Sequence, residues 1–191
     1  DMVSGNTTIT AEGDVLFADV NNDGNLVSIN NATIDATTIA IENGDDINNL
    51  TATADTISVK TNAIDSSKLT ADDVTFDESV AGNGTTIGET SPVTVEDAET
   101  ITINNLKKAV IETLNDSDVT IDATELEGFD GSSLTVDANT NVTINSTIDT
   151  ISGMVDGNVA INETDDIVID NLVADNATIA AENVAVDTII A

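Results

Sequence analysis

The sequence lacks histidine, cysteine, arginine, tryptophan and tyrosine altogether. Without cysteine there are no disulfides and no thiol ligands, and without histidine there is no imidazole base and no ordinary zinc site. Catalysis would have to depend on carboxylates, hydroxyls and the lysines Lys60, Lys68, Lys107 and Lys108. We therefore expect the protein not to be an enzyme.

Positive charge is also scarce. Four Lys face 36 Asp and Glu in 191 residues, which gives a formal net charge of -32. Nucleic-acid binding requires a basic surface, so this balance excludes nucleic acid as a natural partner. No apolar run is long enough to span a bilayer.

The chain is nevertheless 40% hydrophobic with one Pro, and it is dense in β-branched residues, which favours a folded β protein over a disordered polyelectrolyte.

Short apolar-x-apolar triplets recur along the whole chain, and each indicates a three-residue strand with two side chains pointing inward. The last residues of one set lie about 25 positions apart: Ile9, Ile34, Val59, Ile87, Ile111, Val136, Ile161 and Val186. Two further series interleave with it. This pattern predicts an all-β parallel β-helix (β-solenoid) with three short strands per coil, about 25 residues per coil, and seven full coils plus a partial eighth. A β-sandwich is the alternative.

We expect a single β-solenoid domain over 1–191, with a loop insertion at a corner at 77–84. Neither end shows a cap, which favours end-to-end homo-oligomers through open solenoid ends. The equal alternative is a piece trimmed from a longer chain. A start at Asp1 suits an exported, processed protein, although a boundary chosen for expression would look the same.

Acidic residues gather at the expected corners, and the repeat predicts carboxylate stacking, with Glu112 over Asp137 and Glu96 over Asp122. Like charges at one strand spacing repel by about 1–3 kcal/mol per pair. Divalent cations, high salt or protonation would have to compensate for this repulsion. A solvated, solubilising acidic surface is the simpler interpretation of most of these residues.

The segment Asp19-Val20-Asn21-Asn22-Asp23-Gly24 spaces oxygen-bearing side chains at alternate positions before a turn glycine, as calcium binding requires. It resembles the calcium loops of dockerins and of integrin-like propellers. That resemblance implies Ca²⁺ as a cofactor, held by Asp19, Asn21, Asp23 and the backbone carbonyl of Asn25. The loop departs from the EF-hand pattern at Asn30, where a bidentate Glu would stand. An ion-free Asn/Asp-rich turn is the alternative.

Asn-x-Ser/Thr sequons are consistent with a glycosylated surface protein. They begin at Asn6, Asn31, Asn49, Asn83, Asn115, Asn141, Asn145, Asn162 and Asn176.

At the level of the fold, the chain resembles the stalk solenoids of filamentous-haemagglutinin-type adhesins and related β-helical surface proteins. We expect a structural extracellular (cell-surface) protein: a self-assembling subunit of a filament, sheath or adhesive layer, stabilised by divalent cations. The alternatives are a stalk fragment of a longer adhesin, a polysaccharide-active β-helix enzyme that uses paired carboxylates, and an ice-binding solenoid. The last of these would present the outward threonines Thr8, Thr33, Thr135 and Thr143.

Overall fold

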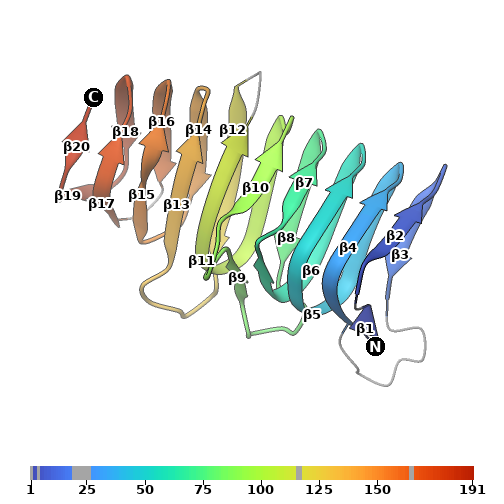
Figure 1. Ribbon diagram of the computed structural model, residues 1–191. Coiled ribbons are helices and arrows are strands. Elements are labelled where there is room, and N and C mark those ends of the chain that lie inside the picture. Colours follow the sequence, from blue (N-terminus) through green and yellow to red (C-terminus); the bar gives the residue numbers. More distant parts are fainter. Residues whose placement is uncertain (1, 4, 19–26, 115–117, 164–165) are drawn as a thin grey trace.

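The computed structural model describes all residues except 1, 4, 19–26, 115–117 and 164–165. The described residues form 20 strands and no helix, and every strand pairing among them is parallel. A tight hairpin cannot join parallel neighbours, so the chain must return to its starting side before each new pairing. Figure 1 shows the result: the strands follow one another along a single axis from the N-terminal to the C-terminal end. The arrangement is compatible with the predicted β-solenoid.

Three stacks of strand segments are in register along this axis. The first stack contains β3 (Asp14–Phe17), β8 (Asp73–Asp77), β12 (Val119–Glu125), β14 (Val142–Ser146), β16 (Asn158–Glu163) and β18 (Asn176–Ala180), together with the opening residues of β5 (Thr38–Thr53), β6 (Thr56–Asp65) and β11 (Thr100–Leu114).

The second stack contains β1 (Met2–Val3), β9 (Thr85–Ile87) and β19 (Asn183–Val186), the later parts of β5, β6 and β11, and the opening residues of β4 (Val27–Asp35), β13 (Ser133–Ala138), β15 (Thr150–Val155) and β17 (Asp166–Val173). The third stack contains β2 (Thr7–Thr10), β7 (Lys68–Thr70), β10 (Val93–Glu96) and β20 (Ile189–Ile190), with the closing residues of the long strands.

The register shows that many coils are shorter than the repeat predicts. Asn145 and Asn162, which are partners on consecutive levels, lie 17 residues apart in the sequence. Asn158 and Asn176, also partners, lie 18 residues apart. Longer steps that match the predicted coil occur only in some places, as between Thr7 and Ala32.

The number of levels is also larger than predicted. In the second stack a single column of ten residues runs the length of the protein, in place of the eight levels expected: Val3, Ile29, Ile47, Ile64, Ile87, Ala109, Leu134, Ile151, Ile169 and Val186. The predicted coil length and coil count are therefore wrong for this structure.

The period seen in the sequence has a geometric origin. A compact coil takes about 17 residues to return to its own stack, and the chain then needs further residues to reach the neighbouring stack. The sum of these two lengths is close to the predicted period. Ile34 therefore lies in the third stack, Val59 in the first and Ile87 in the second, although the spacing suggested one column. All three side chains are buried. The prediction of inward residues was correct at these positions, and the assignment to a common column was wrong.

Columns of aliphatic side chains form the core. Ile39, Ile57, Val74 and Ile101 follow one another in register in the first stack, and none is more than 1% exposed. Burial of one such side chain contributes about 1.5–3 kcal/mol. Because β-branched residues also suit extended backbone, the same residues favour both the strands and the core.

Asparagine allows several long strands to turn from the second stack into the third. Asn31, Asn49 and Asn171 have φ of 56°, 52° and 54°. Asparagine enters this left-handed region more easily than other non-glycine residues. Each of the three lies between the inward residue of one stack and that of the next, so the chain changes direction there without leaving the hydrogen-bonded ladder.

The predicted insertion at 77–84 corresponds to the connection between β8 and β9. A carboxylate organises it: Glu78 accepts hydrogen bonds from the backbone N–H of Gly82 at 3.0 Å and of Gly84 at 2.7 Å. Asp77 accepts from the Asn105 amide at 2.9 Å, which ties the start of the loop to β11. The loop therefore extends a turn without interrupting the stacked core.

Candidate functional site

The predicted calcium loop lies outside the described residues, since Asp19, Asn21, Asp23 and Asn25 all fall within 19–26. The calcium site stays a prediction. Within the part of the chain that the structure describes, no group of three or more acidic side chains is arranged to hold a metal ion.

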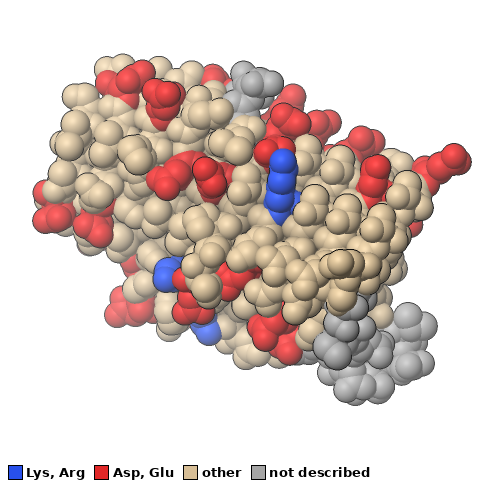
Figure 2. All heavy atoms as spheres, viewed as in Figure 1, with Lys and Arg blue, Asp and Glu red and all other residues tan. Residues whose placement is uncertain are grey.

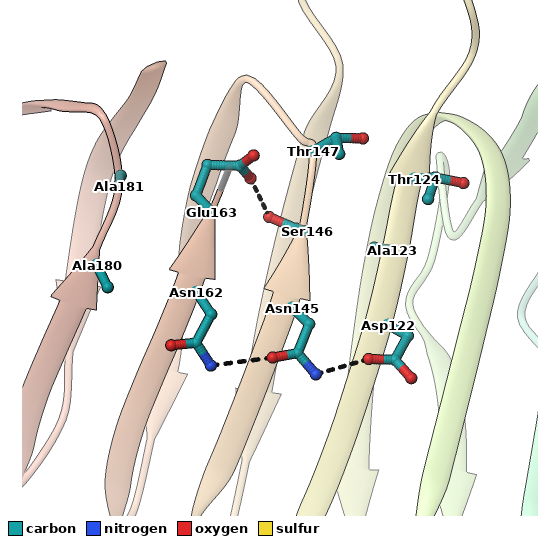
Figure 3. A pocket seen from close by; sticks show the side chains of 10 residues that line it. All are labelled: Asp122, Ala123, Thr124, Asn145, Ser146, Thr147, Asn162, Glu163, Ala180 and Ala181. Carbon is teal, nitrogen blue, oxygen red and sulfur yellow. Dashed lines mark hydrogen bonds between the residues drawn. The ribbon is translucent and has the colours of Figure 1, made fainter. Parts of the chain in front are cut away.

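Four of the predicted sequon asparagines take part in side-chain ladders. Asn145 donates from Nδ2 to Asp122 Oδ1 at 2.7 Å, and Asn162 donates to Asn145 Oδ1 at 2.9 Å (Figure 3). The side chains come from β12, β14 and β16, which are consecutive strands of the first stack. Each amide uses a donor toward the previous level and offers its oxygen to the next.

A second ladder runs parallel to the first, at the beginning of the same strands. Asn141 donates to Asp118 at 2.8 Å, Asn158 donates to Asn141 at 3.0 Å, and Asn176 donates to Asn158 at 2.7 Å. Asn158 also donates its backbone N–H to Asn141 at 2.8 Å. The two ladders connect four levels of the C-terminal half through polar side chains on the outside of the core.

A hollow of about 650 Å³ lies where the first stack turns toward the second. Figure 3 shows Asp122, Asn145 and Asn162 along one side, with Ser146 and Glu163 beyond them. The small side chains of Ala123 and Ala181 occupy inward positions at this corner and leave the space open.

Glu163 is the most unusual residue of this hollow, because its carboxylate occupies an inward position and only 7% of the residue is exposed. It accepts a hydrogen bond from the Ser146 hydroxyl at 2.5 Å and one from the Ile148 N–H at 3.2 Å. Sequence reasoning missed this pair. The alternation in the sequence did indicate it. Val159 and Ile161 point inward, and Glu163 is the next residue on the same side of the strand.

The Ser146–Glu163 pair does not form a nucleophile–base arrangement of the familiar kind. The chain has no histidine, and the carboxylate is held by a hydroxyl and a backbone N–H, which satisfy a buried anion. The geometry assigns Glu163 a structural role, in which it fastens the corner after β14 to the end of β16.

Two lysines of the described chain form ion pairs. Lys60 Nζ lies 2.7 Å from Glu42 Oε2, and Lys68 Nζ lies 2.8 Å from Glu96 Oε1. The hydrogen bond and charge of Glu42 raise the pKa of Lys60. Lys107 lies 5.8 Å from the centre of the Phe129 ring, within the range of a cation–π contact. Most acidic side chains of the described residues have no lysine neighbour, and Figure 2 shows them distributed over the visible face.

Both ends of the stack expose hydrophobic side chains. At the C-terminal end β18 pairs only with β16, while β19 and β20 pair only with β17, as far as the described strands extend. Val184, Val186 and Ile190 are 42%, 52% and 60% exposed. Val186 ends the second-stack column, whose members Ile47, Ile64 and Ile169 are at most 1% exposed. The terminal level thus has the inward residues of a core level without a neighbour to cover them.

Near the N-terminal end, Ile9, Val15 and Phe17 are only partly buried, whereas their register partners Ile34, Ile39 and Ile41 are fully buried. Among the described residues β2 and β3 pair on one side only. These two outer levels, at opposite ends of the axis, are the strongest candidate interaction surfaces of the molecule.

The described residues contain no helix long and apolar enough to cross a membrane. Comparison with known proteins finds no matching family model, no matching curated protein and no matching solved structure.

Proposed function

We propose that the chain is a three-sided parallel β-helix that serves as a structural subunit, joining copies of itself end to end into an extracellular filament, sheath or adhesive layer. The observation that carries this proposal is the pair of outer levels, whose strands pair on one side only among the described residues. Strand edges with unpaired backbone groups are templates for further strands, and covering each exposed Val or Ile would contribute about 1.5–3 kcal/mol. The occupant we propose is a second copy, because the opposite end offers an outer level of the same parallel register.

Cations support this assembly by lowering repulsion between copies. Each subunit carries a formal charge of -32, so bringing two together is unfavourable at low ionic strength. Divalent ions, including Ca²⁺ at the 19–25 loop, would act at low concentration and be removed by a chelator, whereas general screening needs far more salt. The two effects are separable by titration.

Electron microscopy of the purified protein, with calcium and with a chelator, tests the proposal. Ten levels at ~4.8 Å give an expected axial repeat of roughly 48 Å. Val186→Lys places a charge on the uncovered inward position and should abolish polymers. Val168→Lys is the matched control, because Val168 is similarly exposed at 42% but lies one level below on the outer side of β17.

Polymers in the wild type and in Val168→Lys, but not in Val186→Lys, would support end-to-end assembly. Monodisperse wild-type particles in every condition would overturn it and favour the alternative, a stalk in which further coils of a longer chain cover these levels. Polymers that persist in Val186→Lys would also contradict the proposed contact.

Ice binding is the second candidate, and a rank of hydroxyls in the first stack favours it. Thr38 and Thr56 are in register, as are Thr100, Thr120 and Thr143, with Asp73 between the two groups. Of the threonines named from the sequence, Thr143 belongs to this rank, whereas Thr8 and Thr33 lie in the third stack and Thr135 lies in the second. Thermal hysteresis that disappears in Thr100→Lys would favour this function over assembly.

A polysaccharide-active enzyme has less support. The carboxylates of the hollow, Asp122 and Glu163, both accept hydrogen bonds within the fold. Among the described residues that line the hollow there is no aromatic or cationic side chain that would hold a sugar.

A further inference from the structure

The predicted sequon at Asn115 lies outside the described residues, and the asparagines of the other eight sequons differ in their hydrogen bonding. We infer that the sequons at Asn6, Asn31 and Asn49 are the sites at which the folded protein accepts N-linked sugars, whereas the ladder sequons at Asn141, Asn145, Asn162 and Asn176 do not accept them. The inference rests on the extracellular location in the proposed function, but it does not depend on self-assembly.

The acceptor atom is the amide nitrogen, and it must be free to react. In the transfer, Nδ2 of asparagine forms a bond to the anomeric carbon of a lipid-phosphate-linked sugar. The bond from that carbon to the phosphate oxygen breaks, the lipid phosphate leaves with the electron pair, and one amide proton is lost to a base of the transferase. Asn141, Asn145, Asn162 and Asn176 each use Nδ2 as a donor to a neighbouring oxygen in the ladders. Reaction there would remove a ladder hydrogen bond and push a sugar between strands.

The ladder asparagines Asn162 and Asn176 are exposed as well, so it is side-chain hydrogen bonding that distinguishes them from Asn6, Asn31 and Asn49. All three are exposed, and none of their amides donates a side-chain hydrogen bond to another described residue. Asn31 and Asn49 stand at left-handed corners, where the chain turns between stacks. A transferase can therefore reach these amides without opening a strand pair.

The hydroxyl two residues later is also accessible. Thr8, Thr33 and Thr51 are exposed and lie in register on successive levels of the third stack. The contrasting case is the sequon at Asn83, whose hydroxyl residue Thr85 is 0% exposed. That sequon lacks the accessible hydroxyl that the transferase recognises.

The three free sequons together border a polar hollow of about 240 Å³. They sit one level apart, at a spacing of ~4.8 Å, which is close to the thickness of a sugar ring. Neighbouring glycans would crowd one another, so we expect partial occupancy that is shared among the three sites. The attached sugars would form a row along one edge of the solenoid, and the row would begin at the N-terminal outer level, where Asn6 precedes β2.

Treatment of the purified, folded protein with an oligosaccharyltransferase and a lipid-linked donor, followed by peptide mass spectrometry, tests the inference. We expect at least ten-fold higher occupancy summed over Asn6, Asn31 and Asn49 than over the four ladder sequons. Synthetic peptides that contain the Asn49 and Asn176 sequons serve as unfolded controls and should be modified to similar extents.

Thr51→Ala removes the Asn49 sequon while leaving the corner asparagine in place, and it should abolish modification at Asn49 alone. Thr178→Ala is the matched change at the ladder sequon of Asn176 and should alter nothing. Equal modification of ladder and corner sequons in the folded protein would overturn the inference, as would unmodified corner sequons when the peptides react. Because the assay uses dissolved protein, its outcome is independent of whether polymers form.

Discussion

The close contact between Gly153 and Val136 provides a direct test of the winding. Gly153 is in register with Val136 on the previous level and has φ of 147°, a conformation that residues with a side chain rarely adopt. A Cβ added there would lie 1.9 Å from the carbonyl oxygen of Val136 and 2.7 Å from its carbonyl carbon. The substitution Gly153→Ala therefore tests the register between β13 and β15.

The magnitude follows from two costs. Forcing a non-glycine residue into this region of backbone space costs about 1–3 kcal/mol. Relieving the overlap requires the Val136 backbone to move within a buried ladder, and overpacking of this kind costs about 1–3 kcal/mol more. A central value of about 4 kcal/mol corresponds to a melting temperature lower by about 8–16 °C for a chain of this size.

Thermal unfolding followed by circular dichroism, in a salt concentration high enough to screen the surface charge, measures this loss. Gly13→Ala is the control, because a Cβ there has nothing within 4 Å and the backbone is not left-handed. It should leave stability unchanged or raise it by about 0.4–1 kcal/mol through the unfolded state. Equal melting temperatures for Gly153→Ala and Gly13→Ala would refute the register of β13 and β15.

Two further substitutions test the polar contacts. Ser146→Ala removes the hydroxyl donor of the buried Glu163 carboxylate and should lower the free energy of unfolding by about 1–3 kcal/mol. The double variant Ser146→Ala/Glu163→Met also removes the carboxylate and leaves the Ile148 N–H without this acceptor, so it should recover only part of that loss in denaturant titrations. A double variant less stable than the single variant would contradict the assigned role. Because Glu42 raises the folded-state pKa of Lys60 above its ordinary 10.5, the pair stabilises the fold at lower pH and the stabilisation fades as pH rises through the folded pKa. The stability difference between wild type and Lys60→Met should therefore shrink above about pH 10.5, and a constant difference would show that Lys60 acts through packing alone.

The sequence predicted which residues point inward far better than it predicted the number of residues in each coil. Residues such as Ile34 and Ile161 are buried as expected, since alternation along a strand is a local property. The length of a turn is not local, because it depends on how many residues each corner absorbs. Asn31 and Asn49 turn the chain within a single residue, which shortens the coil, whereas the connection at 78–84 lengthens it.

The candidate site shows the same limit. Glu163 was visible as an acidic residue in inward phase, but its partner Ser146 comes from another level, and only the register brings the two together. The asparagine ladders have the same origin. Their members are separated by 17 to 23 residues, so no single sequence window contains a ladder hydrogen bond.

The register also explains how a fold of stacked parallel strands accommodates so many carboxylates. Of the two acidic stacks predicted from the repeat, Glu112 does lie over Asp137, but Glu96 is in register with Thr70 and Leu114 and not with Asp122. Among the register partners of the described strands, Glu112–Asp137 is the one acidic pair. Elsewhere a carboxylate neighbours Thr, Ser, Asn, Lys or an apolar residue, as Asp122 neighbours Thr102 and Asn145. Even Asp137 accepts the Met154 backbone N–H at 2.9 Å.

Direct repulsion between paired strand residues of adjacent levels is thus largely avoided by the order of residues. At the corner before the first stack, however, acidic residues of adjacent levels do follow one another, since the Glu99 N–H donates to the Asp72 carbonyl and the Asp73 N–H donates to the Asp55 carbonyl. What remains is the long-range field of a chain with a formal charge of -32, which ordinary salt screens over about 10 Å at 0.1 M. This long-range field opposes the assembly of subunits more than the folding of one subunit. Within the paired strands of one subunit, threonine, asparagine and apolar residues separate most of the carboxylates, but where two subunits meet no sequence rule keeps acidic residues apart. The ionic strength needed to join copies should therefore exceed the ionic strength needed to fold one.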